Sequence, residues 1–307
     1  MMSTTERTRS QIPDGFQFTS SPFWPPYHLT SMLRMMSGRF ALAALWLAAG
    51  CGKTETAAHA MNGSRHDVTV TATDYAFRGL PDSLPAGWVT FRLANTGREQ
   101  HMLAVLAVPP ELSQYALMDS LSHGHFPSDV PVGSGVNNVS PGDTAVVTVF
   151  LPADRYVVTC FVTSPDGHAH AAKGMGTYLV TFTSADSGSS RASDATVTLS
   201  RDSIGLSGDT TGSGKRNWSI VSKDSGWKDF EIVRLLPGKT LADAMNWLSQ
   251  PNSGSPAAVA LGGTAGTPPG RPAVVSANLP AGKYLLVLDA FDKSGHVTKT
   301  QRELTLR

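Results

Sequence analysis

The sequence predicts a mainly β fold made of two tandem Greek-key β-sandwiches, each with one inserted helix. The composition is rich in Gly, Pro, Thr, Val and Ser, which favour strands and turns over helices. Segments that alternate apolar and polar residues, such as 68–73 and 195–200, are typical of half-buried strands. Turn residues separate many such segments, which indicates an antiparallel sandwich, and one segment recurs later in the chain.

The recurring segment sets the register of a repeat. The chain reads PGDTAVVTVFLPADRY over 141–156 and PGRPAVVSANLPAGKY over 269–284, with 9 of 16 positions identical at a spacing of 128 (269 − 141). Two unrelated Pro-Gly-bounded strands would not place these identities in one register. We therefore interpret the two halves as copies of one domain.

The N-terminal region has the pattern of an export signal. An apolar run over 40–51 follows Arg34 and Arg39 and ends at Cys51. This order of basic, apolar and small residues is typical of a secretory signal peptide, and the run is too short to span a bilayer as a stable helix. The predicted segments are 1–31, a non-native or disordered extension; 32–50, the signal peptide; and 51–66, a polar tether.

Two domains and a linker are expected in the rest of the chain. The polar stretch 184–194 has the composition of a flexible linker. It separates a first domain at 67–183 from a second at 195–307. Each domain contains one predicted helix, at 110–121 in the first and from a capping box at 240–243 in the second.

The first domain contains residues that a sandwich would bring together. His101 opens a strand, and Cys160 ends another. His170 and Met175 lie in the loop that follows, where His168 is an alternative to His170. Two imidazoles, a thiolate and a weak thioether suit copper, because soft sulfur favours Cu(I) and imidazole accommodates Cu(II).

The pattern around these residues resembles the cupredoxins. That family places a His after an Asn-x-Gly-x-x-x-His turn, a Cys four residues past a strand Tyr, and a His and a Gly-Met in the loop that enters the last strand. Here 95–101, 156–160 and 170–175 match those elements, and the resemblance covers 66–183 and, more weakly, 195–307.

The resemblance implies a plastocyanin-like fold and one copper ion in the first domain. It implies that His101, Cys160 and His170 are strong ligands and that Met175 is a weak axial ligand. The sequence departs from the family in the loop length, because nine residues separate Cys160 from His170.

The second domain lacks this ligand set. Aligned on the repeat, Leu288 stands at the position of Cys160, and Lys228 or Asp229 stands at the position of His101. Since the fold recurs without the ligands, folding does not require them, and the metal site is assigned to the first domain. A weaker second metal candidate is the pair His123 and His125, which is expected to be solvent-exposed.

The end of the signal, Leu-Ala-Ala-Gly-Cys51, resembles the lipobox of bacterial lipoproteins. In that family the cysteine is acylated and becomes the first residue of the mature chain, so the resemblance implies lipidation at Cys51. An ordinary cleaved signal peptide is the alternative. Acyl chains anchor a protein to a membrane, and Gly52 favours the outer membrane by analogy with lipoprotein sorting.

Together these features predict an exported, membrane-anchored copper protein on the periplasmic face of a bacterial membrane. It would transfer electrons to a redox protein partner or hold copper. The alternative is a metal-free tandem sandwich lipoprotein that acts as a binding or scaffold module. A formal net charge of +1 gives no attraction to nucleic acid, and the sequence lacks nucleophile-elbow, phosphate-loop and zinc-protease motifs, so we expect no enzyme.

Overall fold

The computed structural model describes residues 66–307 except 128, 129, 132, 186, 251, 253 and 293–295. The predicted extension and signal peptide, Cys51 with its lipobox, and the tether up to residue 65 lie outside the described residues. All described residues belong to a single unit.

The described residues of the first copy form nine strands, one α-helix and one 3₁₀ helix. In order they are β1 Asp67–Thr73, β2 Ala76–Arg78, β3 Ser83–Pro85, β4 Gly87–Asn95, β5 His101–Ala107, α1 Gln114–Ser122, β6 Ser134–Val139, β7 Thr144–Leu151, β8 Arg155–Thr159, η1 His170–Lys173 and β9 Gly176–Phe182.

In the second copy, the residues that the structure describes form eight strands and one α-helix. They are β10 Ala195–Ser200, β11 Ser203–Gly208, β12 Gly214–Ser222, β13 Trp227–Leu235, α2 Leu241–Ser249, β14 Ala258–Thr264, β15 Ala273–Leu279, β16 Gly282–Phe291 and β17 Val297–Leu306. Each element has a counterpart at the same place in the first copy, where β3 and η1 are additional. The predicted fold class, mainly β with one inserted α-helix per copy, is confirmed.

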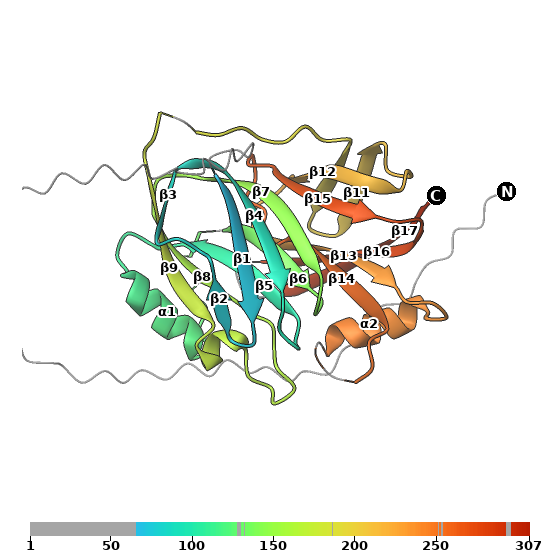
Figure 1. The fold of residues 1–307 in the computed structure, drawn as a ribbon, viewed down its shortest axis with the longest axis horizontal. Helices are drawn as coiled ribbons and strands as arrows, with labels where there is room; N and C mark the ends of the chain where they lie inside the picture. The colour runs from blue at the N-terminus through green and yellow to red at the C-terminus, as the bar shows by residue number, and fades with distance from the viewer. Residues whose placement is uncertain are drawn as a thin grey trace, which may run out of the picture. The chain divides into compact units, whose positions relative to one another are not determined.

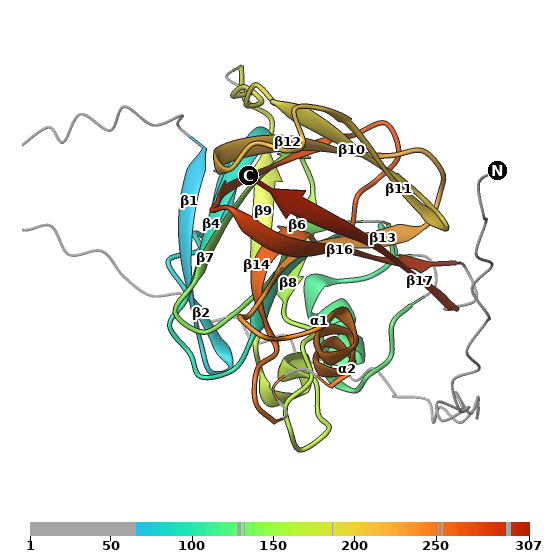
Figure 2. The same ribbon diagram turned by 90° about the vertical axis from the view of Figure 1, so that its right-hand side faces the viewer.

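Both sheets contain strands of both copies (Figure 1, Figure 2). One sheet has the order β11-β10-β12-β15-β7-β4-β1-β2, and the other has the order β17-β16-β13-β14-β6-β5-β8-β9-β3. The first copy therefore supplies one half of each sheet and the second copy the other half. Strands β5, β8 and β9, which lie in one sheet, lead into and out of the candidate site.

Pairing within each copy is antiparallel except at its first strand and at β3. Strand β1 pairs parallel with β4, and β10 pairs parallel with β12. In each copy the first strand forms a hairpin with the edge strand of the sheet, β2 or β11. The chain then crosses to the other side of the first strand, where β4 or β12 runs parallel to it. Strand β3 also pairs parallel with β9. The sandwich is thus antiparallel apart from these pairs, which the sequence did not predict, because periodicity predicts which side chains face the core but not the strand order.

The two copies join edge to edge through antiparallel strands, β6 with β14 and β7 with β15. Equivalent residues pair directly: Val136 with Thr264, and Val147 with Val275 (264 − 136 and 275 − 147 are both 128). Antiparallel strands centred on equivalent residues have the symmetry of an isologous dimer interface. A pseudo-two-fold axis therefore relates the copies, and one hydrophobic core contains residues of both.

The repeat extends to individual hydrogen bonds. The Tyr156 hydroxyl donates to the carbonyl oxygen of Pro152 at 2.8 Å. The Tyr284 hydroxyl donates to the carbonyl oxygen of Pro280 at 2.6 Å. Both bonds close the corner that precedes a central strand, as a tyrosine corner does in other sandwiches. The conserved register of the Leu-Pro-Ala turns therefore has a structural reason.

Each α-helix begins at a side-chain cap. In the first copy Ser113 Oγ accepts from Ala116 N at 3.0 Å, so the helix begins at Gln114 rather than at residue 110. In the second copy Thr240 and Asp243 form the predicted capping box. Neither helix of the described part is long and apolar enough to cross a membrane.

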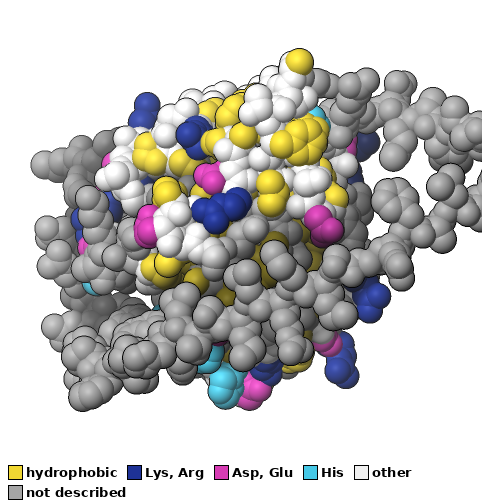
Figure 3. All heavy atoms as spheres, turned by 90° about the vertical axis from the view of Figure 1, so that its left-hand side faces the viewer, with side chains coloured by type: hydrophobic (Ala, Val, Ile, Leu, Met, Phe, Trp, Pro, Cys, Tyr) yellow, Lys and Arg dark blue, Asp and Glu magenta, His cyan; other side chains and the backbone are white. Residues whose placement is uncertain are grey.

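Charged side chains of both signs are interspersed on the face seen in Figure 3. Basic and acidic groups alternate there with apolar and neutral polar groups over the part that is coloured. This mixed surface agrees with the formal net charge of +1.

Candidate metal centre

The loop between β4 and β5 is held in shape by Asn95. Its Oδ1 accepts from Gly97 N at 2.9 Å, and its Nδ2 donates to the carbonyl oxygen of Glu99 at 2.8 Å. A Cβ atom at Gly97 would lie 2.5 Å from Asp74 Oδ1 and 2.7 Å from His101 Nε2, so the turn needs glycine there. The loop thus presents His101, fully buried, at the start of β5.

Cys160 follows β8 and is fixed on both sides by backbone hydrogen bonds. Its N–H donates to the carbonyl oxygen of Met175 at 3.3 Å, and its own carbonyl accepts from Ala171 N at 2.9 Å. Met175 N donates to the carbonyl oxygen of His170 at 2.9 Å. The 3₁₀ helix η1 therefore returns the chain to the end of β8.

The long loop between the cysteine and the histidine is taken up by a hairpin-like excursion. Gly167 N donates to the carbonyl oxygen of Ser164 at 2.9 Å, which closes a β-turn over 164–167. Thr163 and Ala169 form an isolated antiparallel bridge at its base. The additional loop length is therefore accommodated before His170 and does not keep that residue from the site.

Three candidate ligands converge in the first copy. His101 Nδ1 lies 3.1 Å from His170 Nδ1, and Cys160 Sγ lies 3.4 Å from His170 Nδ1. One donor atom from each of the three lies within 4.8 Å of the others, and all three residues are fully buried. Donors that share one ion at about 2.0–2.3 Å are roughly 3.3–4.6 Å apart, so small shifts would close this group on a metal.

Of the other predicted site residues, His168 and His123 lie away from this group, and Met175 lies next to it. His168 lies on the turn, with its side chain 70% exposed and its Nδ1 3.5 Å from Asp166 Oδ1, so the structure brings His170 rather than His168 to the group. Met175 is fully buried beside Cys160 through its backbone. His123 has a 66% exposed side chain and contacts Asp119.

Two carboxylates contact the outer nitrogens of the imidazoles. Glu99 Oε2 lies 2.9 Å from His170 Nε2, and Asp74 Oδ1 lies 3.6 Å from His101 Nε2. Histidines that bind metals commonly donate their other N–H to a carboxylate, which fixes the ring orientation. Glu99 lies inside the motif that predicted His101, but its own role was missed.

Burial is the main reason that both imidazoles are neutral. It lowers the pKa of His101 to about 4, and the neighbouring His170 adds to the effect. It also lowers the pKa of His170, although the hydrogen bond to Glu99 acts in the opposite direction. Burial alone would raise the pKa of Glu99, but its hydrogen bonds, first the one from His170, hold that pKa below its usual value. Near neutral pH a neutral imidazole therefore faces a carboxylate anion.

This charge state decides where the ring protons lie. A carboxylate only accepts, so His170 Nε2 donates to Glu99 and His170 Nδ1 presents a lone pair. If His101 Nδ1 carries a proton toward that lone pair, its buried Nε2 has no hydrogen-bond partner. If Nε2 carries the proton instead, two lone pairs face each other at 3.1 Å. A metal ion bound by both Nδ1 atoms removes the repulsion between the two lone pairs and leaves Nε2 of His101 protonated toward Asp74, so the residues fit such an ion.

Cys160 is a free, buried cysteine. Burial raises the pKa of its thiol to about 12, although the backbone N–H groups of Met102 and Val162 act to lower it. Met102 N lies 3.4 Å from Cys160 Sγ. A metal ion replaces the thiol proton when it binds, so a site of this kind would hold the thiolate even though the free thiol does not ionise near neutral pH.

Tyr75 covers the group from the outside, and no sequence motif predicted this role. Its ring packs edge-on against His170 with centroids 5.2 Å apart, and its hydroxyl donates to Glu99 Oε1 at 2.9 Å. Lys173 Nζ lies 4.7 Å from the centroid of the Tyr75 ring. A strand-ending Asp-Tyr dipeptide carries no recognisable metal motif, so only the fold shows this contact.

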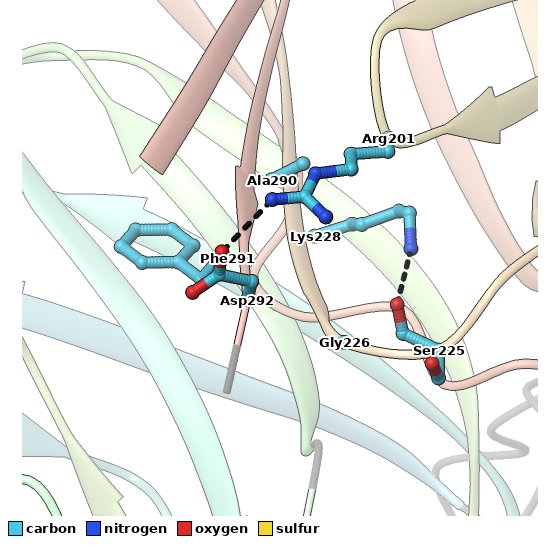
Figure 4. Close-up of a pocket in the computed structure, with 7 residues that line it drawn as sticks. All are labelled: Arg201, Ser225, Gly226, Lys228, Ala290, Phe291 and Asp292. Carbon is cyan, nitrogen blue, oxygen red and sulfur yellow. Dashed lines mark hydrogen bonds and ion pairs between the residues drawn. The ribbon is translucent and has the colours of Figure 1, made fainter. Parts of the chain in front are cut away.

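The corresponding place in the second copy contains an ion pair. Ala104 pairs with Thr159 in the first copy, and Glu231 pairs with Val287, the equivalent of Thr159, in the second. Ala104 therefore corresponds to Glu231, and three residues earlier Lys228 stands at the position of His101. The Lys228 side chain is 1% exposed, and its ammonium contacts the Asp224 carboxylate and donates to the carbonyl oxygen of Ser225 at 3.2 Å. Figure 4 shows this lysine in a cavity of about 380 Å³, near the Arg201–Asp292 pair.

Comparisons with known proteins give structural similarities only. No protein-family model and no curated protein matches the chain. Similar solved structures include reduced auracyanin from Roseiflexus castenholzii (18% identity over 39% of this chain and 99% of that one, TM-score 0.29). Auracyanin A from Chloroflexus aurantiacus, described as a "blue" copper protein, is 24% identical over 38% of this chain and 99% of that one (TM-score 0.26). Blue copper oxidase from Nitrosomonas europaea is 15% identical over 76% of this chain and 85% of that one (TM-score 0.24).

Because these TM-scores are low, the metal centre stands on its own geometry. That geometry is a fully buried His–Cys–His group with inward-facing imidazole nitrogens. It is consistent with a type-1 copper site, the class in which two histidines and a cysteine bind copper.

Proposed function

We propose that this chain is a copper protein whose first copy holds one ion between His101, Cys160 and His170 and passes electrons to a redox partner. The observation that carries the proposal is the convergence of these three fully buried donors, with the two Nδ1 atoms 3.1 Å apart and Sγ 3.4 Å from one of them. Met175, buried next to Cys160, is the proposed weak axial ligand.

Copper bound there would supply one-electron chemistry. The chain's own part is to keep the donors in place in both oxidation states. His170 is held by the Glu99 carboxylate at its outer nitrogen, and Cys160 is held by backbone bonds on both sides. The outer nitrogen of His101 faces the Asp74 carboxylate at 3.6 Å. Donors that are fixed in this way move little when the charge on the ion changes, as an electron carrier requires.

Burial favours electron transfer over delivery of copper to another protein. Both imidazole side chains are 0% exposed, and Cys160 is also 0% exposed. A protein that hands on its metal must let an incoming ligand reach the ion, and no donor of this group reaches the surface. We therefore assign the ion as a resident cofactor, and we propose no enzymatic activity.

We further propose that the protein is attached to the periplasmic face of a bacterial membrane, with the outer membrane favoured, through acyl chains on Cys51. The support is the signal-like sequence at 32–50 and the lipobox-like end of that segment. Labelling with a radioactive fatty acid tests it: wild type should incorporate label, and Cys51→Ser should not.

The copper proposal is tested by loading the purified protein with Cu(II). We expect one bound ion per chain and an intense thiolate-to-copper charge-transfer band in the visible spectrum. Cys160→Ser should abolish the band, whereas Cys51→Ser, which changes the chain's other cysteine, should keep it. Absence of the band in wild type, or its survival in Cys160→Ser, would favour the metal-free scaffold instead.

A further inference from the structure

The second copy contacts the candidate centre through Asn252, which lies between α2 and β14. Its Oδ1 accepts from Gln100 N at 2.6 Å, and its Nδ2 donates to Glu99 Oε2 at 3.3 Å. Gln100 directly precedes His101, and Glu99 binds His170. One side chain of the second copy therefore contacts the neighbours of both imidazole ligands.

A third contact joins the same side chain to the loop after Cys160. Asn252 Nδ2 also lies 3.3 Å from the carbonyl oxygen of Thr163. Its amide thus bridges the two segments of the first copy that carry the candidate ligands, the β4–β5 loop and the chain between β8 and η1. These segments meet at the group, so their separation influences the distance between His101 and His170.

Backbone conformation marks two residues that act on the same carboxylate. Among the described non-glycine residues, only Tyr75 and Asn252 have positive φ, at 65° and 64°. Such conformations are unfavourable and persist where surrounding contacts fix them, often at functional sites. Tyr75 donates to Glu99 Oε1, while Asn252 and His170 contact Oε2. Both unusual backbone positions therefore converge on the partner of a candidate ligand.

The pseudo-two-fold axis explains how the second copy comes to lie there. The α-helices of the two copies are 127 positions apart (241 − 114). A residue of the segment after each helix contacts the other copy. After α1, the Phe126 ring packs against Trp227, centroids 5.9 Å apart, next to Lys228. After α2, the contact is instead polar and meets Glu99. The contact between the copies is therefore apolar on the side of the second copy that lacks ligands. On the side of the candidate centre, the equivalent contact is polar and involves Glu99, the carboxylate partner of His170.

We propose that Asn252 is a positioning residue that the second copy contributes to the copper centre of the first. It holds Glu99 in the orientation that fixes His170, and it holds the backbone before His101. This rests on the proposed function. It also gives the ligand-free second copy a role in the site, because the centre in the first copy is incompletely supported without it.

Two variants and a control separate this role from general folding. Asn252→Gly removes the amide and accepts the left-handed backbone without strain. Asn252→Asp keeps an acceptor for Gln100 N but places a second carboxylate beside Glu99. Asn246→Ala changes an exposed asparagine of α2 and serves as the control.

The readouts are the cupric EPR hyperfine splitting and the rate at which a chelator removes copper. Replacing the hydrogen-bond partner of a metal ligand typically weakens metal binding by about 10–100-fold. We therefore expect Glu99→Gln to weaken copper binding by a factor in that range and Asn252→Gly to weaken it by about tenfold or less. Asn252→Asp should shift the hyperfine splitting further than Asn252→Gly. In the double variant with Glu99→Gln, the change at Asn252 should have a smaller effect than it has alone, because the part that acts through Glu99 is already lost.

The proposal is overturned if Asn252→Gly matches wild type and Asn246→Ala in both readouts, or if its effect adds in full to that of Glu99→Gln. A double-mutant cycle on the unfolding of the metal-free protein gives an independent result. If wild type takes up no copper, the proposed function is wrong, and this cycle then decides the contact: coupling between positions 252 and 99 supports it, and its absence contradicts it.

Discussion

The carboxylate of Glu99 lies 2.9 Å from Nε2 of His170, a residue 71 positions further along the chain. Because the carboxylate can only accept, this contact sets the tautomer of the ring and turns its Nδ1 lone pair toward Cys160 Sγ, 3.4 Å away. The direction in which His170 can bind a metal is therefore determined by a residue that is not itself a ligand.

Replacing the Glu99 carboxylate should weaken copper binding without removing the site. In Glu99→Gln the amide no longer stabilises a charged or strongly polarised imidazole, and we expect copper affinity to fall by about 10–100-fold. Competition with a chelator measures it. The control is Glu111→Gln, at an exposed position of the same copy. Equal affinities for the two variants would show that Glu99 does not orient His170.

A side chain at position 97 should displace His101. In Gly97→Ala the new Cβ would lie 2.5 Å from Asp74 Oδ1 and 2.7 Å from His101 Nε2. We expect a loss of about 1–3 kcal/mol in unfolding free energy, as for other overpacked sites, together with weaker copper binding. Gly205→Ala is the matched control, because the nearest atom to its Cβ is 3.4 Å away. Unchanged copper binding in Gly97→Ala would contradict the described position of His101.

The resemblance to the cupredoxins predicted that His101, Cys160 and His170 meet, and the structure brings these three side chains together. The sequence favoured His170 through the resemblance and kept His168 as an alternative, since both lie in one loop. The bridge between Thr163 and Ala169 directs the turn outward and leaves His168 exposed.

The contribution of the second copy could not be predicted. Asn252 lies 152 positions from Gln100, and no local pattern encodes a contact over that distance. The polar stretch 184–194 suggests separate domains. The two copies instead share their sheets, because edge strands of one copy pair with edge strands of the other, and the sequence does not indicate which strands lie at an edge. The domain boundaries themselves stay a prediction, although both sheets run through both copies.

A buried carboxyl group at the junction of the copies should make stability depend on pH. Burial raises the pKa of Glu231 to about 8, and the nearby Asp289 and Asp229 add to the rise. Asn138 Nδ2, which lies 3.3 Å from Glu231 Oε2, and Lys299 act to lower this pKa. The folded state therefore binds this proton more tightly than the unfolded state, whose pKa is about 4.3.

The contribution of Glu231 to the unfolding free energy should accordingly be highest below about pH 4.3, and it should fall as the pH rises toward about 8. Glu231→Gln mimics the protonated acid, so urea denaturation at pH 5 and pH 8 should show a smaller difference than in wild type. Glu303→Gln, at an exposed position, should keep the wild-type difference. A wild-type slope in Glu231→Gln would contradict the assignment.

Equivalent hydrogen bonds should contribute similarly in the two copies. Tyr156→Phe and Tyr284→Phe each remove a hydroxyl that donates to a carbonyl four residues earlier. We expect each to lower the unfolding free energy by about 0.5–1.5 kcal/mol. Chemical denaturation compares them, and a loss confined to one variant would show that the two corners are not equivalent.

X-ray absorption at the copper edge of the loaded protein tests the central claim most directly. The account predicts two imidazole nitrogens and one sulfur at short distance, from His101, His170 and Cys160, with the sulfur lost in Cys160→Ser. A copper ion surrounded only by nitrogen and oxygen, unchanged in Cys160→Ser, would contradict a copper centre at the buried His–Cys–His group.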